Sequence, residues 1–450
     1  MKILLPTKVK AILDRLEEYG YEGYAVGGCV RDTVMGRTPS DWDITTSATP
    51  QQIKRIFPHT VDTGIAHGTI TVMIEREGFE VTTYRIDGEY EDSRHPKQVI
   101  FTPSLREDLR RRDFTVNAMA YNEKSGLVDC FGGIEDLKRG VIRCVGRAEE
   151  RFGEDALRMM RAVRFCAQLG FELDSDTTAA MAQLAPTLKR ISAERIQAEL
   201  VKLLVSPHPD WLRMAWENGI TAQVLPEFDR MMEQPQNNAH HIYSVGIHTL
   251  ETMKAIPADR ILRLTMLMHD MGKPDTSSVD EQGVYHYRGH AERSAEIAAK
   301  ILKRLKFDND TYARTVRLVR NHSLYPAEDP ESVRRSICVF GQDLFPAFLE
   351  VKRADILGQS PAVHQNKLAY LERIRGIYEG ILERGECLSL KTMHLTGKDL
   401  IEDGMTPGRA LGEILDQLFD EVLTDPQKNN REYLLERSRQ LRKNSCGSRD

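Results

Sequence analysis

A pair of adjacent glycines at a predicted strand-to-helix turn constrains the fold of this chain more than any other feature. Gly27-Gly28 lies between the apolar segment 24–26, which predicts a short buried strand, and residues 30–35, which predict a helix. Glycines at such a turn let the backbone approach a ligand closely. The helix N-terminus and Arg31 offer donors to phosphate oxygens, so the turn is predicted to bind a triphosphate.

Two aspartates follow this turn. Asp41 and Asp43 fall in a predicted strand over 41–45, where residues two apart share a face, so both carboxylates can serve the same pair of Mg²⁺ ions. Alternation in the predicted strand 79–84 makes Glu80 a candidate third carboxylate. The glycine pair alone is typical of an ordinary turn, and the aspartate pair alone is typical of solvated aspartates. Together they favour two-metal nucleotidyl transfer, with Asp41, Asp43 and Glu80 as catalytic residues.

Composition limits the class of protein. The 450 residues, 41% hydrophobic and 29% charged, predict a soluble chain of several domains. The sequence contains no apolar stretch of about 20 residues, and the apolar start is too short for a signal peptide, so no membrane association and a cytoplasmic location are expected. The seven scattered cysteines predict neither a disulfide framework nor a zinc knuckle. The net charge of −5 means that RNA contacts must come from local basic surfaces.

The pattern of secondary structure divides the chain in two. Up to about Gly140, short predicted strands alternate with helices, including helices over 8–19 and 50–57 and strands over 68–74 and 117–121. From about Glu150 onward helical periodicity dominates. The predicted fold class is therefore α+β, with an α/β head followed by an all-helical remainder.

An arginine stripe marks the start of the helical part. Arg158, Arg161 and Arg164 recur every third position in a predicted helix over 154–165, and this spacing places them along one face. A solvated helix face is the alternative interpretation. The neighbouring face is apolar, so the helix is predicted to be amphipathic.

Several motifs occur in the order seen in class II tRNA nucleotidyltransferases, the CCA-adding enzymes, and the chain resembles that family almost continuously through its first half. The motifs are Gly27-Gly28-x-Val-Arg31-Asp32, Asp41-x-Asp43, Arg111-Arg112-Asp113-Phe114-Thr-Val-Asn117-Ala-Met119-Ala, Glu154-Asp155-x-x-Arg158 and Ser192-Ala-Glu194-Arg195. The resemblance implies template-independent addition of C, C and A to the 3′ end of tRNA, with CTP and ATP as substrates and Mg²⁺ as cofactor.

The same resemblance assigns roles to residues. Asp155 and Arg158 would read the Watson–Crick edge of the incoming base, since a carboxylate accepts from an exocyclic amine and a guanidinium donates to ring acceptors. The nucleotide-binding residues it implies are Gly28, Arg31, Arg112, Asn117, Asp155, Arg158, Arg161 and Arg164.

Related activities remain open at this stage. Bacterial poly(A) polymerases share the catalytic half, but residues 64–72 are similar to the CCA-adding form. CC-adding relatives lack part of a flexible loop, whereas residues 85–96 resemble the intact loop. An enzyme that adds only A is a further alternative. A non-enzymatic RNA-binding module that retains the fold is the alternative from another class.

The second half carries histidines and aspartates in an order that resembles the HD phosphohydrolase superfamily: His248, His269, Asp270, His290, His322 and Asp355. The resemblance implies one or two divalent metals, Mn²⁺ or Ni²⁺, and phosphatase or 2′,3′-cyclic phosphodiesterase activity. A purely structural role for these residues is the alternative. The predicted domains are a catalytic head (1–148), a neck that recognises the base and binds RNA (149–230), an HD-like body (240–365) and a tRNA-binding tail (366–442).

Overall fold

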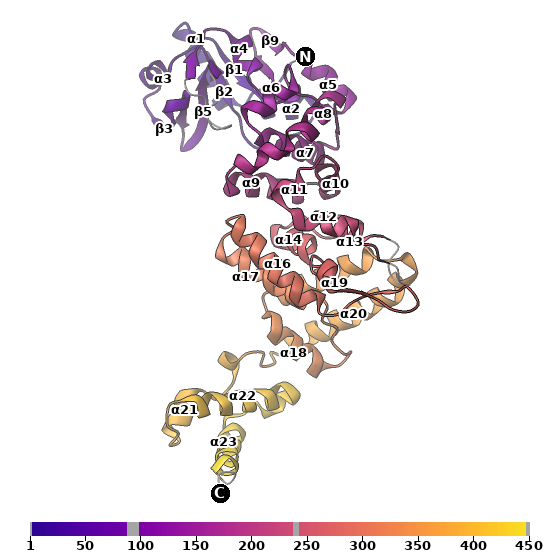
Figure 1. The fold of residues 1–450 in the computed structure, drawn as a ribbon. Coiled ribbons are helices and arrows are strands. Elements are labelled where there is room, and N and C mark those ends of the chain that lie inside the picture. Colours follow the sequence, from indigo (N-terminus) through magenta and orange to yellow (C-terminus); the bar gives the residue numbers. More distant parts are fainter. Residues whose placement is uncertain (1, 88–98, 237–242, 447–450) are drawn as a thin grey trace. The chain divides into compact units, whose positions relative to one another are not determined.

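The computed structural model describes residues 2–87, 99–236 and 243–446. The chain divides into two compact units (Figure 1). The first comprises Met1–Asp229 with Arg304–Lys306, and the second comprises Arg230–Lys303 with Phe307–Asp450. The finer division into head, neck, body and tail stays a prediction.

The first unit is built on a seven-stranded sheet of order β3-β4-β5-β2-β1-β8-β9. β2 pairs in parallel with β5, and the other neighbours are antiparallel. A separate hairpin joins β6 to β7. The strands are β1 (Gly23–Val26), β2 (Ile44–Thr46), β3 (Thr60–Gly64), β4 (Thr69–Ile74), β5 (Glu77–Thr83), β6 (Arg85–Asp87), β7 (Val99–Phe101), β8 (Met119–Asn122) and β9 (Gly126–Asp129).

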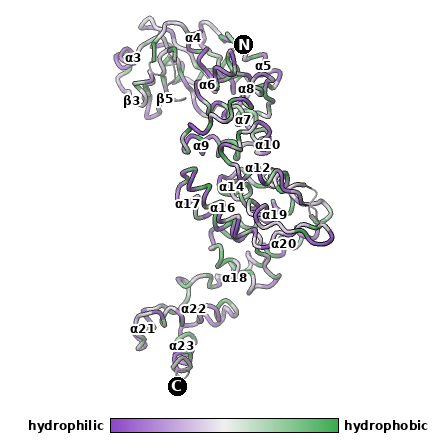
Figure 2. The backbone as a smooth tube through the Cα atoms, viewed as in Figure 1, coloured by the Kyte–Doolittle hydropathy of each residue, from purple (hydrophilic) through white to green (hydrophobic). Residues whose placement is uncertain are grey.

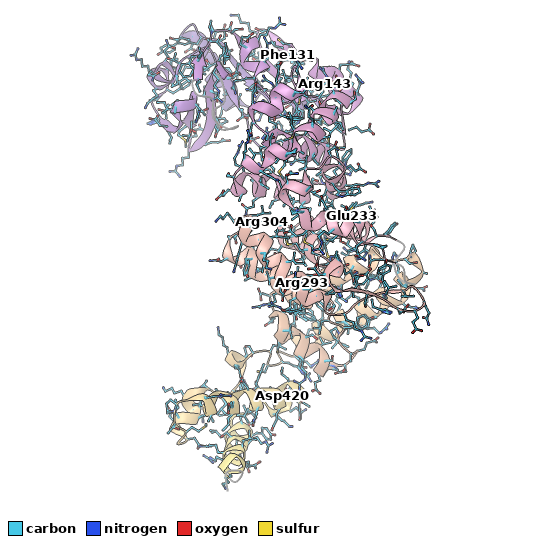
Figure 3. The ribbon with its side chains drawn as sticks, in the orientation of Figure 1. Phe131, Arg143, Glu233, Arg293, Arg304 and Asp420 are labelled. Carbon is cyan, nitrogen blue, oxygen red and sulfur yellow. The ribbon has the colours of Figure 1, made fainter. Side chains whose placement is uncertain are left out.

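Helices cover this sheet with apolar faces. In α1 (Thr7–Glu18), Val9, Ile12 and Leu16 are buried at helical spacing and belong to the same core cluster as residues of β2, β4 and β5. The side chain of Arg143 donates to Asp136 and to the Phe131 carbonyl, which fixes the start of α5 (Figure 3). The other helices of this part are α2 (Gly28–Val34), α3 (Pro50–Ile56), α4 (Leu105–Arg110) and α5 (Gly133–Arg139).

Two predicted boundaries are wrong in this unit. The strand predicted over 41–45 begins only at Ile44, so Asp41 and Asp43 precede it. The single helix predicted over 154–165 is broken at Asp155, whose φ of −144° and ψ of 103° are extended. The Asp155 carboxylate instead accepts from the Leu157 amide, so it satisfies a free donor at the start of the next helix.

The rest of the first unit is helical apart from the two-residue strands β10 (Val141–Ile142) and β11 (Glu172–Leu173), which pair in parallel. α12 runs across the boundary between the units. The helices are α6 (Ala148–Glu154), α7 (Leu157–Leu169), α8 (Ser175–Leu184), α9 (Ala193–Leu204), α10 (Leu212–Glu217), α11 (Thr221–Val224) and α12 (Pro226–Glu233).

Among its described residues, the second unit is helical apart from a short hairpin of β12 (Ser277–Val279) and β13 (Tyr285–Tyr287). One core cluster includes Phe340, Phe345 and Phe348, and another around Leu400 and Leu418 holds the last helices together. The helices are α13 (Val245–Ala255), α14 (Arg260–Met268), α15 (Lys273–Thr276), α16 (His290–Arg304), α17 (Asn309–Asn321), α18 (Pro330–Phe340), α19 (Phe345–Leu357), α20 (Pro361–Glu383), α21 (Gly397–Glu402), α22 (Arg409–Thr424) and α23 (Arg431–Cys446).

Short 3₁₀ helices connect these elements: η1 (Ile65–His67), η2 (Thr115–Asn117), η3 (Ala185–Arg190), η4 (Pro209–Trp211), η5 (Leu390–Thr392) and η6 (Pro426–Lys428). Hydrophilic and hydrophobic residues alternate along the helices of both units (Figure 2). Within the described residues, no helix combines the length and the apolar character needed to cross a membrane.

Candidate functional site

The first unit contains a pocket of about 660 Å³ at the glycine turn. It collects most of the residues predicted to bind a nucleotide, although they come from distant parts of the sequence. Its lining includes Gly27, Gly28, Arg31, Asp41, Asp43, Arg112, Asp113, Asn117, Arg161, Arg164, Phe165, Gln168 and Lys202.

The glycine turn is tight because other groups approach it. Gly27 has a φ of 82°, which L side chains rarely adopt, and α2 begins at the next residue. A Cβ added to Gly27 would lie 3.1 Å from Arg112 Nη1. The backbone therefore leaves the turn open to a ligand and places the arginine directly beside it.

A buried hydrogen-bond network holds Arg31 at the pocket. Its Nη1 donates to Asn117 Oδ1 over 2.6 Å and its Nε donates to Asp32 Oδ1 over 2.9 Å. Asn117 Nδ2 in turn donates to Asp113 Oδ1 over 3.3 Å. Since the partners fix the guanidinium plane, Arg31 is positioned in advance for an anionic ligand.

The three candidate carboxylates lie near one another, with Asp41 and Asp43 just before β2 and Glu80 on the neighbouring strand β5. The Asp43 carbonyl accepts from the Val26 amide over 3.0 Å, which ties the aspartates to β1. Ile44 of β2 is paired with Val81 of β5, so the preceding residue, Asp43, lies next to Glu80. Desolvation, followed by the charge of Asp41, raises the pKa of Asp43 to about 6; Arg112 opposes this shift and Glu80 adds to it.

The three carboxylates are spread more widely than the ligands of a single compact metal site. Among the described residues, Asp41, Asp43 and Glu80 do not belong to the groups whose ligand atoms all lie within 4.8 Å of one another. Like charges close enough to raise a pKa do favour a bound cation. The two aspartates, lining an open pocket, therefore fit an ion that takes its other ligands from water and phosphate.

Arginines and one aromatic ring form the wall on α7. Arg161 donates two hydrogen bonds to Asp113, and Arg164 Nε lies 2.7 Å from Glu199 Oε2. The guanidinium of Arg164 lies 3.9 Å from the centre of the Phe165 ring, with Arg31 at 5.2 Å from the same ring. The predicted arginine stripe is therefore not a solvated face.

Burial shifts the charges of this wall. Burial alone would raise the pKa of Asp113, but the charge and hydrogen bonds of Arg161, with smaller contributions from Arg158 and Asn117, lower it to about 2. Burial lowers the pKa of Arg164 to about 10, against the charge of Glu199. Asp113 belongs to a motif in the sequence to which no role was assigned, and Glu199 and Phe165 were not predicted as site residues. The arginine-rich motif around Asp113 was the available signal.

Asp155 and Arg158 do not line this pocket. Asp155 accepts from Arg195, with Arg195 Nη2 at 2.6 Å from Asp155 Oδ2. Arg158 donates to Glu154 and to the carbonyl of Arg111. Both predicted base-reading side chains are therefore held by partners within the first unit. The predicted loop over 85–96 lies largely outside the described residues.

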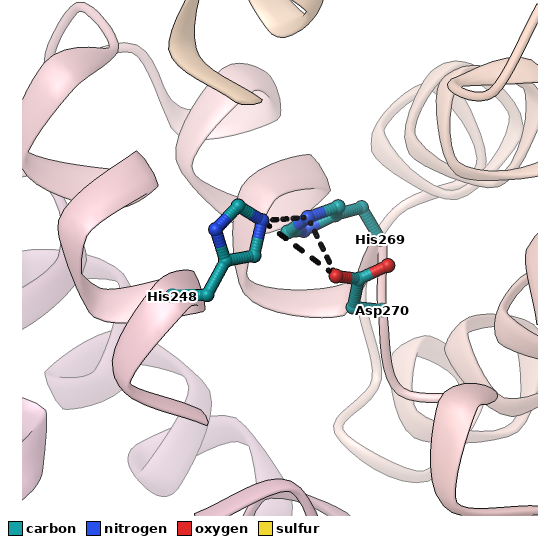
Figure 4. Close-up of side chains that lie close together, drawn as sticks. All are labelled: His248, His269 and Asp270. Atoms are coloured by element: carbon teal, nitrogen blue, oxygen red, sulfur yellow. Dashed lines mark hydrogen bonds and ion pairs between the residues drawn. The ribbon is translucent and has the colours of Figure 1, made fainter. Parts of the chain in front are cut away.

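The second unit brings all six predicted histidines and aspartates together. Asp270 belongs to two groups whose ligand atoms lie within 4.8 Å of one another, one with His248 and His269 (Figure 4) and one with His290 and His322. Asp355 completes the cluster, with Oδ1 at 3.1 Å from His248 Nε2. The resemblance to the HD phosphohydrolase superfamily implied this convergence, and the six residues come from five different helices or helix ends.

Backbone carbonyls orient the four imidazole rings. Each Nδ1 lies 2.7 to 3.0 Å from a carbonyl oxygen, those of Gly358, Met266, Tyr287 and Val319. A carbonyl only accepts, so each Nδ1 carries a proton, and a ring in its neutral form turns the lone pair of Nε2 inward. This is the outer hydrogen bond that metal-binding histidines make.

The inward nitrogens face one another at short range. The Nε2 atoms of His248 and His269 are 3.4 Å apart, and those of His290 and His322 are 3.2 Å apart. Burial and the nearby ring of His269 lower the pKa of His322 to about 3, and burial also lowers that of His290. Lone pairs that converge on the buried carboxylate of Asp270 and the partly exposed carboxylate of Asp355 fit divalent cations, so the donor set is of the kind that the predicted metal site requires.

Three family models match the chain. The poly A polymerase head domain matches residues 23–143, the probable RNA and SrmB-binding site of polymerase A matches 170–232, and the putative tRNA nucleotidyltransferase domain 2 matches 290–437. The CCA-adding enzyme of Leuconostoc mesenteroides is 54% identical over 194 residues, which span 43% of this chain and 48% of that enzyme. Alignments of this kind thus cover about half the length of those relatives.

Another relative extends over nearly the whole chain. The CCA-adding enzyme of Ligilactobacillus salivarius is 34% identical over 444 residues, 96% of each chain. The chain belongs to the CCA-adding enzyme family. The structure of the Bacillus stearothermophilus CCA-adding enzyme in complex with CTP has a TM-score of 0.75 and 32% identity, and it covers 98% of this chain and 100% of that one. CCA-adding enzymes are tRNA nucleotidyltransferases and use divalent metals.

Proposed function

We propose that this chain adds CCA to the 3′ end of tRNA, without a template, from CTP and ATP. The observation that carries the proposal is the pocket in the first unit, which is lined by the glycine turn, by Asp41 and Asp43, and by five arginines. This arrangement suits a triphosphate, because donors and positive charge surround a backbone that a phosphate can approach.

The residues would act by binding and orienting the nucleotide. Arg31, Arg112 and the Gly28 amide would hold the phosphates while the tRNA 3′-hydroxyl attacks the α-phosphorus and pyrophosphate leaves. Bound at Asp41 and Asp43, Mg²⁺ supplies Lewis-acid activation of the hydroxyl and neutralises the leaving group. We assign Glu80 a supporting role, because it lies beside Asp43.

Base selection is assigned to Asp155 and Arg158. Their present ion pairs, with Arg195 and Glu154, occupy the atoms that would contact a base. We infer that base reading requires these pairs to exchange for the amine and ring acceptors of C or A. Asp155→Ala should therefore reduce the preference for CTP and ATP over UTP and GTP more than it reduces tRNA affinity.

The test of the main activity is incubation with tRNA that lacks its 3′ end, supplying CTP and ATP separately and then together. Growth by three nucleotides only with both substrates supports the proposal. With both nucleotides present, arrest at CC would instead identify a CC-adding enzyme, extension only of tRNA that already ends in CC would identify an A-adding enzyme, and long A tracts would identify a poly(A) polymerase.

Catalysis and binding are separated by variants. Asp41→Ala and Asp43→Ala should abolish incorporation, whereas Asp62→Ala, which removes an exposed partner of Lys54, should not. If incorporation persisted in both active-site variants, the acidic pair would not be catalytic. If the wild-type protein bound tRNA but incorporated no nucleotide, the alternative of a non-enzymatic RNA-binding module would be supported instead.

We propose a second activity, metal-dependent hydrolysis of phosphoesters, at the cluster of the second unit. The observation that favours it is the convergence of four oriented Nε2 atoms on Asp270 and Asp355. Mn²⁺ or Ni²⁺ bound there would lower the pKa of a coordinated water. The water oxygen would bond to phosphorus, and the ester oxygen would leave with a proton.

Wild-type protein should bind Mn²⁺ and hydrolyse a 2′,3′-cyclic nucleotide, and His269→Ala should lose both properties. Absence of metal binding would establish the structural role instead.

A further inference from the structure

One wall of the pocket in the first unit lies outside the sequence motifs described above. It is formed by the C-terminal ends of α7 and α9 and by the segment that follows α9. All of its residues belong to the first unit, so the wall is complete within that unit. The residues of this wall that line the pocket are Gln168, Leu169, Lys202, Val205, Ser206 and Pro207.

The two helices run in the same direction. Asp155, just before α7, pairs with Arg195 near the start of α9, and Arg164 pairs with Glu199 one turn further along α9. The next turn of each helix carries Gln168 and Lys202, which share a face with the residues of that second pair. Gln168 and Lys202 therefore stand at adjoining positions of the pocket wall.

Lys202 brings a positive charge to this wall that the protein does not match. Its side chain is exposed in the last turn of α9. Its ammonium forms no hydrogen bond or ion pair with any residue that the structure describes, although Glu199 lies only three positions earlier. The charge is therefore available to an anion in the pocket.

The other cations of the pocket are engaged or lie elsewhere. Arg37 has no carboxylate partner among the described residues, but its amide donates to the Asp32 carbonyl, which ties it to the glycine-turn side. The remaining four arginines are paired with carboxylates: Arg31 with Asp32, Arg112 with Asp108, Arg161 with Asp113 and Arg164 with Glu199.

Gln168 adds an oriented hydrogen-bond donor beside Lys202. Its Oε1 accepts from Arg164 Nη1 over 3.4 Å, which leaves the amide nitrogen to donate elsewhere. Within the described part of the chain that nitrogen has no acceptor. A ribose hydroxyl is an acceptor of the kind it needs.

The proposed reaction requires a second place for an anion. The 3′-hydroxyl of tRNA attacks the α-phosphorus in line with the departing pyrophosphate. Since the pyrophosphate is assigned to the glycine turn, the acceptor has to enter along another wall. Its terminal nucleotide changes with each addition, so the contact must be made to the backbone rather than to a base. A lysine, with a compact charge on a flexible stem, meets this requirement.

We propose that this wall receives the terminal nucleotide of the tRNA acceptor, with Lys202 bound to its phosphodiester and Gln168 to its ribose. The inference rests on the proposed CCA addition. It deepens that function by separating the side chains that position tRNA from those that bind the incoming nucleotide.

The kinetic test measures KM for tRNA that lacks its 3′ end and KM for CTP separately on the full-length protein. Lys202→Gln should raise KM for tRNA about tenfold, as expected for a lost hydrogen bond to a charged group, and leave KM for CTP unchanged. The slope of log KM for tRNA against log salt concentration should fall by about 0.7, because one phosphate contact is lost. Lys202→Arg should be close to wild type, and Gln168→Leu should raise KM for tRNA selectively.

Lys138→Gln is the matched control. Lys138 is an exposed lysine of α5 that does not line the pocket, so both KM values should stay unchanged. A lysine in the last turn of a helix also interacts favourably with the helix dipole, so the melting temperature of each variant is measured as well. A purely structural role for Lys202 would lower the melting temperature and kcat without separating the two KM values.

A second measurement requires no incorporation. Periodate converts the terminal ribose of tRNA that lacks its 3′ end into a dialdehyde, and this tRNA is mixed with metal-free protein and cyanoborohydride. A nearby lysine forms an imine with the aldehyde, water leaves, and the hydride reduces the imine. Among the described residues that line the pocket, Lys202 is the only lysine. Peptide mass mapping should therefore place the label on Lys202.

The outcomes distinguish this inference from the proposed function. If wild type adds CCA but Lys202→Gln keeps its KM for tRNA, or the label falls on a lysine outside the pocket, the inference is overturned and the function stands. A rise in KM for CTP alone would assign the wall to the incoming nucleotide and would also overturn it. Selective labelling of Lys202 in a protein that incorporates no nucleotide would support the acceptor contact and overturn the proposed function.

Discussion

At the scale of single residues, the acidic pair that the proposed function requires lowers the stability of the folded first unit. The pKa of Asp43 is about 6 in the folded protein, raised by desolvation and then by Asp41, whereas its unfolded value is near 3.9. Because the folded state binds the proton more tightly, the ionised carboxylate weakens folding. That penalty is complete above about pH 6 and vanishes as the pH falls to about 4.

Asp43→Asn should therefore raise the melting temperature of the metal-free protein near neutral pH, and the gain should disappear at about pH 4. Scanning calorimetry in the presence of a chelator measures both. Asp62→Asn is the control, because Asp62 pairs with Lys54 on the surface and its loss should give no gain. Equal melting temperatures near neutral pH would mean that the carboxylates do not repel one another.

A glycine beside the metal cluster supports a second prediction at this scale. The carbonyl of Gly358 accepts from His248 Nδ1, and a Cβ at Gly358 would lie 2.5 Å from Thr252 Cγ2 and 3.0 Å from His248 Nδ1. Gly358→Ala should displace the ring and weaken Mn²⁺ binding about 10- to 100-fold, the usual effect of disturbing an outer partner of a metal ligand. Chelator competition measures the affinity.

Gly376→Ala is the matched control for this substitution. Gly376 lies inside α20, and an added Cβ there meets nothing within 4 Å. It should leave Mn²⁺ affinity unchanged and stabilise the helix slightly. Equal affinity in the two alanine variants would mean that the Gly358 carbonyl does not position His248.

At the scale of elements, α14 delivers His269 and Asp270 from its C-terminal end and is anchored at its N-terminus by Asp259. The Asp259 side chain accepts from the amides of Ile261 and Leu262 over 2.9 and 3.0 Å. Asp259→Ala should lower the free energy of unfolding of the second unit by about 1 kcal/mol, because both amides lose their acceptor.

Urea titration followed by circular dichroism measures this effect. Asp259→Asn retains a capping oxygen and should be close to wild type. If Asp259→Ala and Asp259→Asn unfolded at the same urea concentration, solvent would be shown to replace the cap without cost.

Sequence patterns predicted the elements where local chemistry decides them. Alternation in β5 placed Glu80 opposite the buried Phe79 and Val81, as the structure confirms. The same patterns misplaced Asp41 and Asp43 on a strand, because β2 begins where it acquires β1 and β5 as neighbours, and a local window contains no such information. The break at Asp155 was missed for a related reason: its carboxylate satisfies the next helix, which competes with helical propensity.

The sites follow the same division. The cluster was predicted because the order of its histidines and aspartates resembles a known superfamily. Glu199 and Phe165 were not predicted, since their relevance depends on which distant side chains surround them. Packing across the chain creates that information.

At the scale of the whole molecule, the two proposed activities are assigned to two different compact units. Asp41→Ala should therefore abolish nucleotide incorporation and leave hydrolysis of the cyclic nucleotide unchanged, while His269→Ala should do the reverse. Both assays on the same preparations measure this double dissociation. Loss of both activities in either variant would show that the units depend on each other for folding or for catalysis.

The anchoring of the four imidazole rings to main-chain carbonyls also has a kinetic meaning. An ion held by these rings would dissociate only when one of the supporting helix ends loosens. The rate at which the ion exchanges with a labelled ion in solution would therefore measure how often such local opening occurs. Slow exchange would identify the second unit as rigid on the timescale of minutes. If bound RNA increased the exchange rate, RNA binding would be shown to loosen the backbone that supports the rings.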